Sequence, residues 1–261
     1  MCSHENHEEQ LEQKSAKEEI IDDSITYKWA SIADVGYPSI ADTIPSEIYE
    51  RICYSVSYND STRQPNWVMW QLLGEHIMKR KEGMWNDYME DPDVKEENRA
   101  TLVDYASSGF DRGHMCPGGD CNWNDEGRYE TFFLSNMCPQ NPNLNRGDWK
   151  EIEIACRTWA KKYGNLYIVC GPIFFKSQNH IKIGVNQIPV PEAFFKVILC
   201  LDEFSPKGIG FICRNTDGNR KKDFYVNSIK QVERVTGYKF FPQVADSIKS
   251  KVYNMDDINC W

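Results

Sequence analysis

The side chains best suited to chemistry gather between residues 111 and 153. Residues 111–114 read Asp-Arg-Gly-His, and Asn136, Asn145 and Glu153 follow. A neutral imidazole can act as a general base, a guanidinium can bind phosphate oxygens, and amide or carboxylate oxygens can ligate a hard cation. This combination of residue types indicates hydrolysis of a phosphate ester with the help of a divalent metal ion.

Three elements are expected to position these groups. Residues 111–114 lie where the chain enters one predicted strand, and residues 130–136 are predicted to form a second strand. Apolar residues at helical spacing predict a helix over residues 145–163. In a continuous helix, the segment from Asn145 to Glu153 turns by about 800° and rises by about 12 Å, which leaves the two side chains about 80° apart. We therefore expect Glu153 to hold a metal-bound water rather than to share direct ligation with Asn145.

The rest of the chain supplies a sheet core. Apolar runs bounded by turn signals predict strands at residues 50–59, 67–73, 166–174, 193–199 and 208–212. No linker or internal repeat interrupts residues 27–261, which predicts a single domain. Residues 1–26 are charged and lack hydrophobic periodicity, so we expect a disordered acidic tether there.

The order and spacing of these motifs resemble the DNA/RNA non-specific endonuclease family. Besides residues 111–114, the resemblance rests on residues 135–140 (Ser-Asn-Met-Cys-Pro-Gln) and 144–153 (Leu-Asn-Arg-Gly-Asp-Trp-Lys-Glu-Ile-Glu), with weaker echoes over residues 47–243. It implies an α+β fold of the ββα-metal endonuclease type, with a central antiparallel sheet flanked by helices. The active site of that fold is a two-stranded ribbon followed by a helix around one metal ion. The resemblance also implies sugar-non-specific hydrolysis of DNA and RNA that leaves 5′-phosphates.

Residue chemistry and the resemblance together suggest a role for each group. We expect His114 to deprotonate the attacking water, Arg112 to bind the scissile phosphate, and Asn145 to hold one Mg²⁺ or Mn²⁺ ion that stabilises the leaving 3′-oxygen. Glu153 should reach this ion through a water, and Asn136, by resemblance, should orient His114 or the hydrated metal. The structural alternative for His114 is a core histidine whose ring nitrogens are both hydrogen-bonded. The structural alternative for Asn136 is an asparagine that caps a turn.

Two further residues also have structural interpretations. Glu153 could pair with Arg157, which lies four positions later on the predicted helix. Arg112 could form a salt bridge, for example to Asp111 or Asp148, and Asp111 is expected to anchor the ribbon rather than to do chemistry.

Other cations near these motifs could contact the nucleic-acid backbone. Arg146 and Lys150 lie near the start of the predicted helix, where a solvated helix face is the alternative. Family members carry an arginine shortly before an Asp-Pro pair, here residues 91–92, but residues 84–86 hold none. Arg80 is the candidate to replace it.

The overall charge is unusual for a protein that meets nucleic acid. The net charge is −9, but the first 24 residues account for −6, which leaves −3 for the remainder. A mildly acidic body can carry a local basic groove, although its overall field does not steer nucleic acid toward it. No apolar run reaches the ~18 residues that a membrane-spanning helix needs.

The ten cysteines are scattered rather than arranged in paired Cys-x-x-Cys sets. They predict partial disulfide formation in an exported protein, for example among Cys116, Cys121 and Cys138; buried free thiols are the alternative, and the spacing disfavours zinc. Cys2 followed by an acidic tail resembles the mature start of a bacterial lipoprotein. This predicts a lipid anchor at Cys2 and an extracytoplasmic location, secreted or attached to the cell envelope.

Two other function classes compete with the nuclease. A catalytically silent surface module on the same scaffold, binding nucleic acid or protein, would fit the acidic charge and the missing upstream arginine. A cysteine hydrolase fits less well, because Cys116 lies in a turn with no helix start to lower its pKa. The resembling family contains dimers, so a second copy of this chain is a candidate partner.

Overall fold

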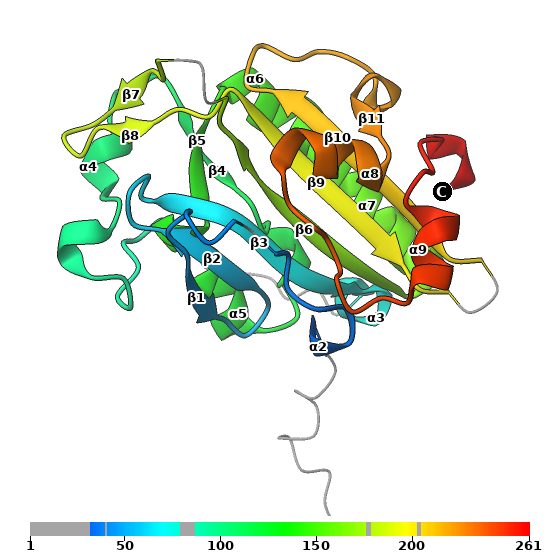
Figure 1. Cartoon of the computed structure of the whole chain (residues 1–261). Helices are drawn as coiled ribbons and strands as arrows, with labels where there is room; N and C mark the ends of the chain where they lie inside the picture. Colours follow the sequence, from blue (N-terminus) through cyan, green and yellow to red (C-terminus); the bar gives the residue numbers. More distant parts are fainter. Residues whose placement is uncertain (1–31, 40, 79–86, 176–178, 203–204) are drawn as a thin grey trace, which may run out of the picture. The chain divides into compact units, whose positions relative to one another are not determined.

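The computed structural model describes residues 32–39, 41–78, 87–175, 179–202 and 205–261 (Figure 1). Seven strands form an antiparallel sheet in the order β1-β2-β3-β6-β9-β10-β11. Their bounds are Glu47–Glu50 (β1), Ser55–Asn59 (β2), Gln64–Leu73 (β3), Asn165–Ile173 (β6), Ala193–Cys200 (β9), Lys207–Arg214 (β10) and Val226–Asn227 (β11). The predicted α+β class and the central antiparallel sheet are confirmed.

Side chains of the central strands alternate between two hydrophobic cores, as the two-residue period of a strand requires. In β3, Val68 and Trp70 point into one core, while Trp67 and Met69 point into the other. Both faces of the sheet are therefore covered, which explains why these strands read as almost continuous apolar runs.

Different helices cover the two faces (Figure 1). Helix α7 (Lys150–Tyr163) packs on one face, which we call the catalytic face, through residues such as Ile152 and Trp159. Helices α8 (Ile229–Thr236) and α9 (Asp246–Val252) pack on the other, which we call the α8 face, through Ile229, Val232 and Val252. None of the described helices is both long and apolar enough to cross a membrane.

Short elements complete the described part of the chain. The helical ones are α2 (Ile32–Val35), α3 (Gly74–Met78), η2 (Glu96–Asn98), α4 (Leu102–Tyr105), η3 (Gly118–Asp120), α5 (Asp125–Glu130), η4 (Leu134–Asn136), α6 (Pro142–Leu144), η5 (Asn145–Trp149), η6 (Lys222–Tyr225) and η7 (Ile258–Cys260). Two small two-stranded antiparallel sheets are formed by β4 (Asp111–His114) with β5 (Met137–Gln140), and by β7 (Lys182–Ile183) with β8 (Ile188–Pro189).

The ribbon forms, but its second strand begins later than predicted. Residues 130–136 are not a strand: α5 runs up to Glu130, and η4 ends at Asn136. Asn124 starts α5 by accepting a hydrogen bond from the Gly127 backbone N at 2.8 Å, which commits this stretch to helix. Strand β5 then pairs with β4 in an antiparallel register that sets His114 opposite Met137.

The predicted helix over residues 145–163 is also interrupted. Residues 145–149 form a π-helical turn, and Gly147 within it has non-helical angles, φ −107° and ψ −106°. Regular α-helix begins only at Lys150. The prediction of one continuous helix is therefore wrong, and the angle expected between Asn145 and Glu153 loses its basis.

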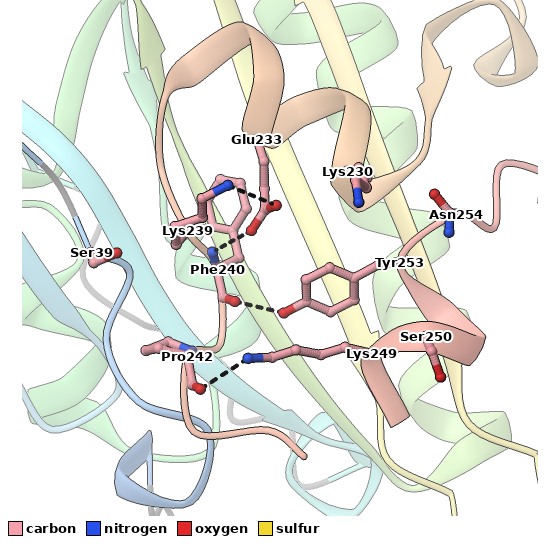
Figure 2. Close-up of a pocket in the computed structure, with 10 residues that line it drawn as sticks. All are labelled: Ser39, Lys230, Glu233, Lys239, Phe240, Pro242, Lys249, Ser250, Tyr253 and Asn254. Carbon is pink, nitrogen blue, oxygen red and sulfur yellow. Dashed lines mark hydrogen bonds and ion pairs between the residues drawn. The ribbon is translucent and has the colours of Figure 1, made fainter. Parts of the chain in front are cut away.

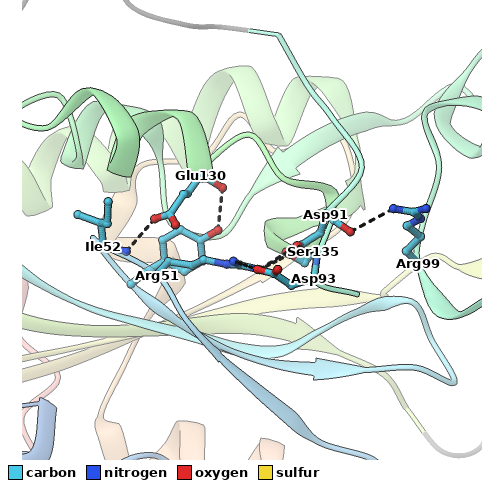
Figure 3. A network of polar contacts seen from close by, with 8 residues as sticks. Arg51, Ile52, Asp91, Asp93, Arg99, Glu130 and Ser135 are labelled. Carbon is cyan, nitrogen blue, oxygen red and sulfur yellow. Dashed lines mark hydrogen bonds and ion pairs between the residues drawn. The ribbon is translucent and has the colours of Figure 1, made fainter. Parts of the chain in front are cut away.

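A buried polar network holds the segment that precedes the second ribbon strand, β5 (Figure 3). The Arg51 guanidinium, which lies between β1 and β2, donates to both Asp91 oxygens at 2.7 and 2.8 Å. Asp91 also accepts from the Ser135 hydroxyl, and the Ile52 backbone N donates to the Glu130 carboxylate at 2.7 Å. These contacts hold η4 in place, and η4 ends at the site residue Asn136.

Candidate active site

His114 ends the first ribbon strand with a ring nitrogen that has no hydrogen-bond partner among the described residues. This nitrogen, Nε2, is buried. The ring packs edge-on against Phe132, with the centroids 4.9 Å apart, and lies 5.5 Å from the Tyr88 ring. Burial, helped by the charge of Arg128, lowers the pKa of His114 to about 3. The imidazole is therefore neutral at pH 7.

Gly113 allows the two ribbon strands to come close together. A Cβ at this position would lie 2.3 Å from Gln140 Oε1, and Gln140 is completely buried. Any larger residue would push the strands apart and displace His114, which follows directly. Glycine is needed here for space.

Arg112 is held by an aromatic ring rather than by a carboxylate. Its guanidinium lies 4.5 Å from the centroid of the Tyr88 ring. It forms no ion pair or side-chain hydrogen bond with the described residues, so the alternative of a salt bridge to Asp111 or Asp148 is not observed. Asp148 accepts from the Tyr225 hydroxyl instead. The donors of Arg112 thus remain available for an anion.

Asp111 ties the start of the ribbon to the turn that carries Asn145. It accepts from Arg146 Nε and Nη2 at 2.8 and 2.7 Å, and from Asn145 Nδ2 at 2.9 Å. Partial burial opposes ionisation, but these hydrogen bonds lower the pKa of Asp111 below its ordinary value. Two nitrogens of Arg146 are thereby engaged with a carboxylate of this chain, and both Arg146 and Lys150 are exposed.

Asn136 makes no hydrogen bond to the His114 ring among the described residues. Its Oδ1 accepts from the Cys116 backbone N at 2.9 Å, and its Nδ2 donates to the carbonyls of Cys116 and Thr131, both at 2.8 Å. All three bonds go to the main chain. Asn136 therefore fixes the backbone two residues after His114.

Glu153 lies beside a buried ion pair that it does not join. Arg157 donates to Asp120 at 2.8 Å, so the predicted alternative of a pair between Glu153 and Arg157 is not observed. Burial raises the pKa of Glu153 to about 7, although the Lys196 ammonium acts in the opposite direction. Glu153 makes no ion pair or hydrogen bond with the described residues, and a near-neutral pKa is typical of a functional carboxylate.

Sequence reasoning missed two charged residues beneath the site. Lys196 on β9 is completely buried, its Nζ has no hydrogen-bond partner among the described residues, and it lies 4.4 Å from the Trp149 ring and 5.0 Å from the Trp70 ring. Asp120 is also buried and accepts from the Trp70 indole at 3.0 Å. The sequence signal for Lys196 was a lysine inside an apolar strand. Asp120 has no such signal in the sequence, and only the fold shows that it is buried.

The donor atoms suit a hard divalent cation. The amide nitrogen of Asn145 bonds Asp111, which leaves its Oδ1 without a hydrogen bond from any described residue. The Glu153 carboxylate is likewise unbonded. Within the described ranges, no three His, Cys, Asp or Glu residues form a metal-binding group. Amide and carboxylate oxygens fit a Mg²⁺-type ion, which keeps several waters, better than zinc.

The expected disulfides are absent from the described residues, where all nine cysteines are free. The Cys116 and Cys121 sulfurs lie 3.9 Å apart, well beyond the ~2.05 Å of a bond. Cys138 lies instead beside Cys170. Eight of these thiols are buried and act as small apolar side chains in the core. Arg80, residues 84–86, Cys2 and the predicted tether lie outside the described residues.

A separate pocket opens on the α8 face (Figure 2). Its volume is about 510 Å³, and it is lined by Lys230, Lys239, Lys249, Glu233 and Tyr253, among others. Two of these lysines already have partners within the protein. Lys249 donates to the Pro242 carbonyl at 2.9 Å, and the Lys239 ammonium lies 3.6 Å from the Glu233 carboxylate. It holds no histidine and no unbonded buried polar atom.

A ribbon that presents a neutral histidine, followed by a helix that carries an amide and a carboxylate, defines a ββα-metal nuclease. The sequence model of the DNA/RNA non-specific endonuclease family matches residues 38–247, and the chain belongs to that family. It is accordingly a phosphodiester hydrolase, an endonuclease that depends on a divalent metal ion.

Individual relatives agree with this assignment. The chain is 30% identical to bovine (Bos taurus) Endonuclease G, mitochondrial, over 84% of this chain and 76% of that protein. It is 34% identical to Nuclease C1 of Cunninghamella echinulata var. echinulata, over 82% and 88%. A crystal structure of an EndoG/EndoGI complex superposes with a TM-score of 0.75 at 27% identity, covering 83% of this chain and 92% of that one.

The expected location is wrong. Relatives from cattle, frog and two yeasts are named as mitochondrial nucleases, which contradicts a bacterial secreted or envelope-attached lipoprotein. The lipid anchor proposed at Cys2 loses its support for the same reason. The many cysteines had suggested export, yet free buried thiols need no oxidising compartment.

Proposed function

We propose that this chain cleaves DNA and RNA with His114 as the general base and one Mg²⁺ or Mn²⁺ ion held by Asn145. The observation that carries the proposal is the His114 Nε2, which is buried, neutral and without a partner at the end of the ribbon. A core histidine with no catalytic task would normally bond both of its ring nitrogens.

In this reaction His114 takes a proton from a water molecule, whose oxygen attacks the phosphorus. The bond to the 3′-oxygen breaks, and this oxygen takes a proton from a solvent water, leaving a 5′-phosphate and a 3′-hydroxyl. Because the pKa of His114 is about 3, the ring is unprotonated across the neutral range. Edge-on packing against Phe132 keeps the ring from turning away.

Arg112 binds the scissile phosphate. Its guanidinium can donate two parallel hydrogen bonds to phosphate oxygens, and the Tyr88 ring beneath it fixes its position at 4.5 Å. No carboxylate of the described chain competes for it. This residue therefore supplies charge at the phosphate without first breaking an internal salt bridge.

Asn145 would hold the metal ion through its Oδ1, and Glu153 would orient a water of the ion's hydration shell. When bound, the ion supplies positive charge that stabilises the departing oxygen. Asp111 keeps the Asn145 amide turned so that the oxygen faces away from the ribbon carboxylate. The ion pair between Arg157 and Asp120 borders Glu153 and limits how its carboxylate can move.

Contacts of this kind read phosphates rather than bases, so cleavage should tolerate many sequences and both sugars. The relatives named as mitochondrial support a mitochondrial location for this chain.

Cleavage of closed circular DNA and of RNA by the purified protein tests the proposal. We expect cutting with Mg²⁺, none with EDTA, and a loss of about 10²–10⁴-fold in His114→Ala. Circular dichroism should show that this variant is folded. If the wild type binds nucleic acid but never cuts with any divalent ion, the silent-module alternative replaces the nuclease.

A further inference from the structure

A second hollow lies beside the ribbon, where β4 begins. Its volume of about 450 Å³ is lined by Phe110, Phe175, Ile181, Glu192 and Arg214, among others. This lies within the roughly 300–1,000 Å³ of typical ligand sites. We propose that this hollow, the ribbon-side pocket, binds one unpaired nucleobase of the substrate strand. The proposal rests on the nuclease function proposed above and adds a contact for the same substrate.

The pocket is attached to the catalytic ribbon. Asn215 in its wall accepts from the Asn141 backbone N at 2.7 Å and donates to the Pro139 carbonyl at 3.0 Å. Phe110 is the last residue before β4. From Phe110 to His114 the strand extends about 13 Å, which equals about four base steps of ~3.4 Å. A strand cut at His114 can therefore place a nearby base in the pocket.

The walls offer apolar surface that is exposed to water. Phe175 is 39% exposed and Ile181 is 67% exposed, although both are large apolar side chains. A nucleobase presents a flat face to an aromatic ring, and such stacking tolerates any base. Covering these side chains with a base removes apolar area from water on both partners.

The charges in the pocket favour a neutral ligand. Glu192 is held in place, because its carboxylate accepts from the Phe175 backbone N at 3.1 Å and pairs with His180 Nδ1 at 2.7 Å. Arg214 forms no side-chain hydrogen bond or ion pair with the described residues. The two wall charges nearly cancel. A phosphate inside the pocket would meet the Glu192 carboxylate, whereas a base would not, and Arg214 can pair with the phosphate next to that base.

An unpaired base is required. In a duplex both faces of each base are covered by stacking and its edge by pairing, so a base must first be unstacked and unpaired before it can enter. Single-stranded DNA and RNA avoid this step. The pocket should therefore strengthen binding of single strands and leave duplex binding almost unchanged.

Equilibrium binding tests the pocket without relying on cleavage. The His114→Ala protein with Mg²⁺ is titrated into a short labelled single strand, or into the duplex of the same sequence, and fluorescence anisotropy is recorded. Adding Phe175→Ala should weaken single-strand binding by about five- to tenfold, the loss of one base stack. Phe175→Trp keeps a ring and should bind like the parent. Val235→Ala removes a similarly exposed apolar side chain (48% exposed) from α8 on the other face and is the matched control.

Each other outcome overturns the proposal. Equal single-strand binding by the Phe175→Ala and Val235→Ala proteins would show that no base enters the pocket. Equal weakening of single strands and duplex would make Phe175 a general contact. A change from dimer to monomer with binding unchanged would make the hollow a contact between copies. If the wild type cuts plasmid normally in any of these cases, only the base pocket fails; if it never cuts, the proposed function fails as well.

Discussion

The two faces of the central sheet differ in how their buried ionisable groups are bonded. On the catalytic face, His114 Nε2 and Lys196 Nζ are buried without hydrogen-bond partners among the described residues. On the α8 face, the Glu233 carboxylate accepts from the Phe240 backbone N at 3.1 Å and the Tyr253 hydroxyl donates to the Phe240 carbonyl at 2.6 Å. The α8 face also holds a buried unbonded atom, Trp67 Nε1, but it belongs to a neutral indole. The unbonded ionisable groups His114 and Lys196 lie on the catalytic face, where an unbonded group costs about 1–3 kcal/mol and function opposes stability.

Strand β9 shows the contrast within one element. Phe195 and Val197 point into the apolar core of the α8 face, whereas Lys196 between them points into the catalytic face. Burial alone would lower the pKa of Lys196, but the acidic groups around it, led by Cys170 and Glu153, raise it. A cation in this position stabilises negative charge on the catalytic face at the expense of core packing.

The largest contrast is expected between the two glutamates that pack on opposite faces. Glu153→Ala should lower cleavage by about 10–100-fold, since residues that orient metal-bound groups contribute that much. Its folding free energy should not fall, because burial already disfavours this carboxylate. Glu233→Ala should keep its activity but lose about 1–3 kcal/mol, as the Phe240 N–H loses its acceptor. Plasmid cleavage and urea unfolding of both variants measure the contrast; equal stability losses would remove it.

A smaller contrast is expected within β9. Lys196→Met keeps the volume but removes the cation, so the Glu153 carboxylate becomes harder to ionise and cleavage at pH 7 should fall by about tenfold, one pKa unit of interaction. Stability should be unchanged or higher, as for other buried charges replaced by apolar groups. Val197→Ala should behave oppositely, with full activity and a loss of about 1–3 kcal/mol. If Lys196→Met retained full activity, Lys196 would have no influence on the site.

The sequence predicted the structural elements that depend on local residue patterns. It did not predict side-chain contacts between residues that lie far apart in the chain. The strands of the central sheet follow from apolar runs, and the ribbon follows from the family resemblance of its motif, although its second strand begins at Met137 rather than at residue 130. The π-helical turn at Gly147 does not follow from such patterns, because apolar residues keep nearly the same spacing on either side of it. Arg157 was expected near Glu153 from its i+4 position, but its partner Asp120 lies 37 positions away in the chain. Only the folded sheet brings such pairs together.

The pH dependence of stability should separate His114 from the rest of the fold. With its pKa lowered from 6.5 to about 3, His114 stays neutral in the folded protein while the unfolded chain binds a proton below pH 6.5. Stability is therefore lost as the pH falls below 6.5, by about 1.4 kcal/mol per pH unit. Glu153, with a raised pKa, acts in the opposite direction between 4.5 and about 7.

His114→Gln isolates the first of these two effects. Unfolding of the metal-free protein in urea, measured in EDTA at pH 6.5 and 5, should show a smaller loss of stability in His114→Gln than in the wild type. Parallel pH curves for the two proteins would mean that the His114 ring is not held neutral by burial.

The smallest effect is expected from single cations on the two faces, measured as the salt dependence of DNA binding. Arg112 has free donors beside Tyr88, whereas Lys249 already donates to the Pro242 carbonyl. Each phosphate contact contributes about −0.9 to the slope of log K against log salt. In the His114→Ala background, Arg112→Ala should therefore reduce the slope by about 1, while Lys249→Ala should leave it unchanged. If Lys249→Ala reduced the slope as much, nucleic acid would contact both faces, and the pocket in Figure 2 would belong to the binding surface.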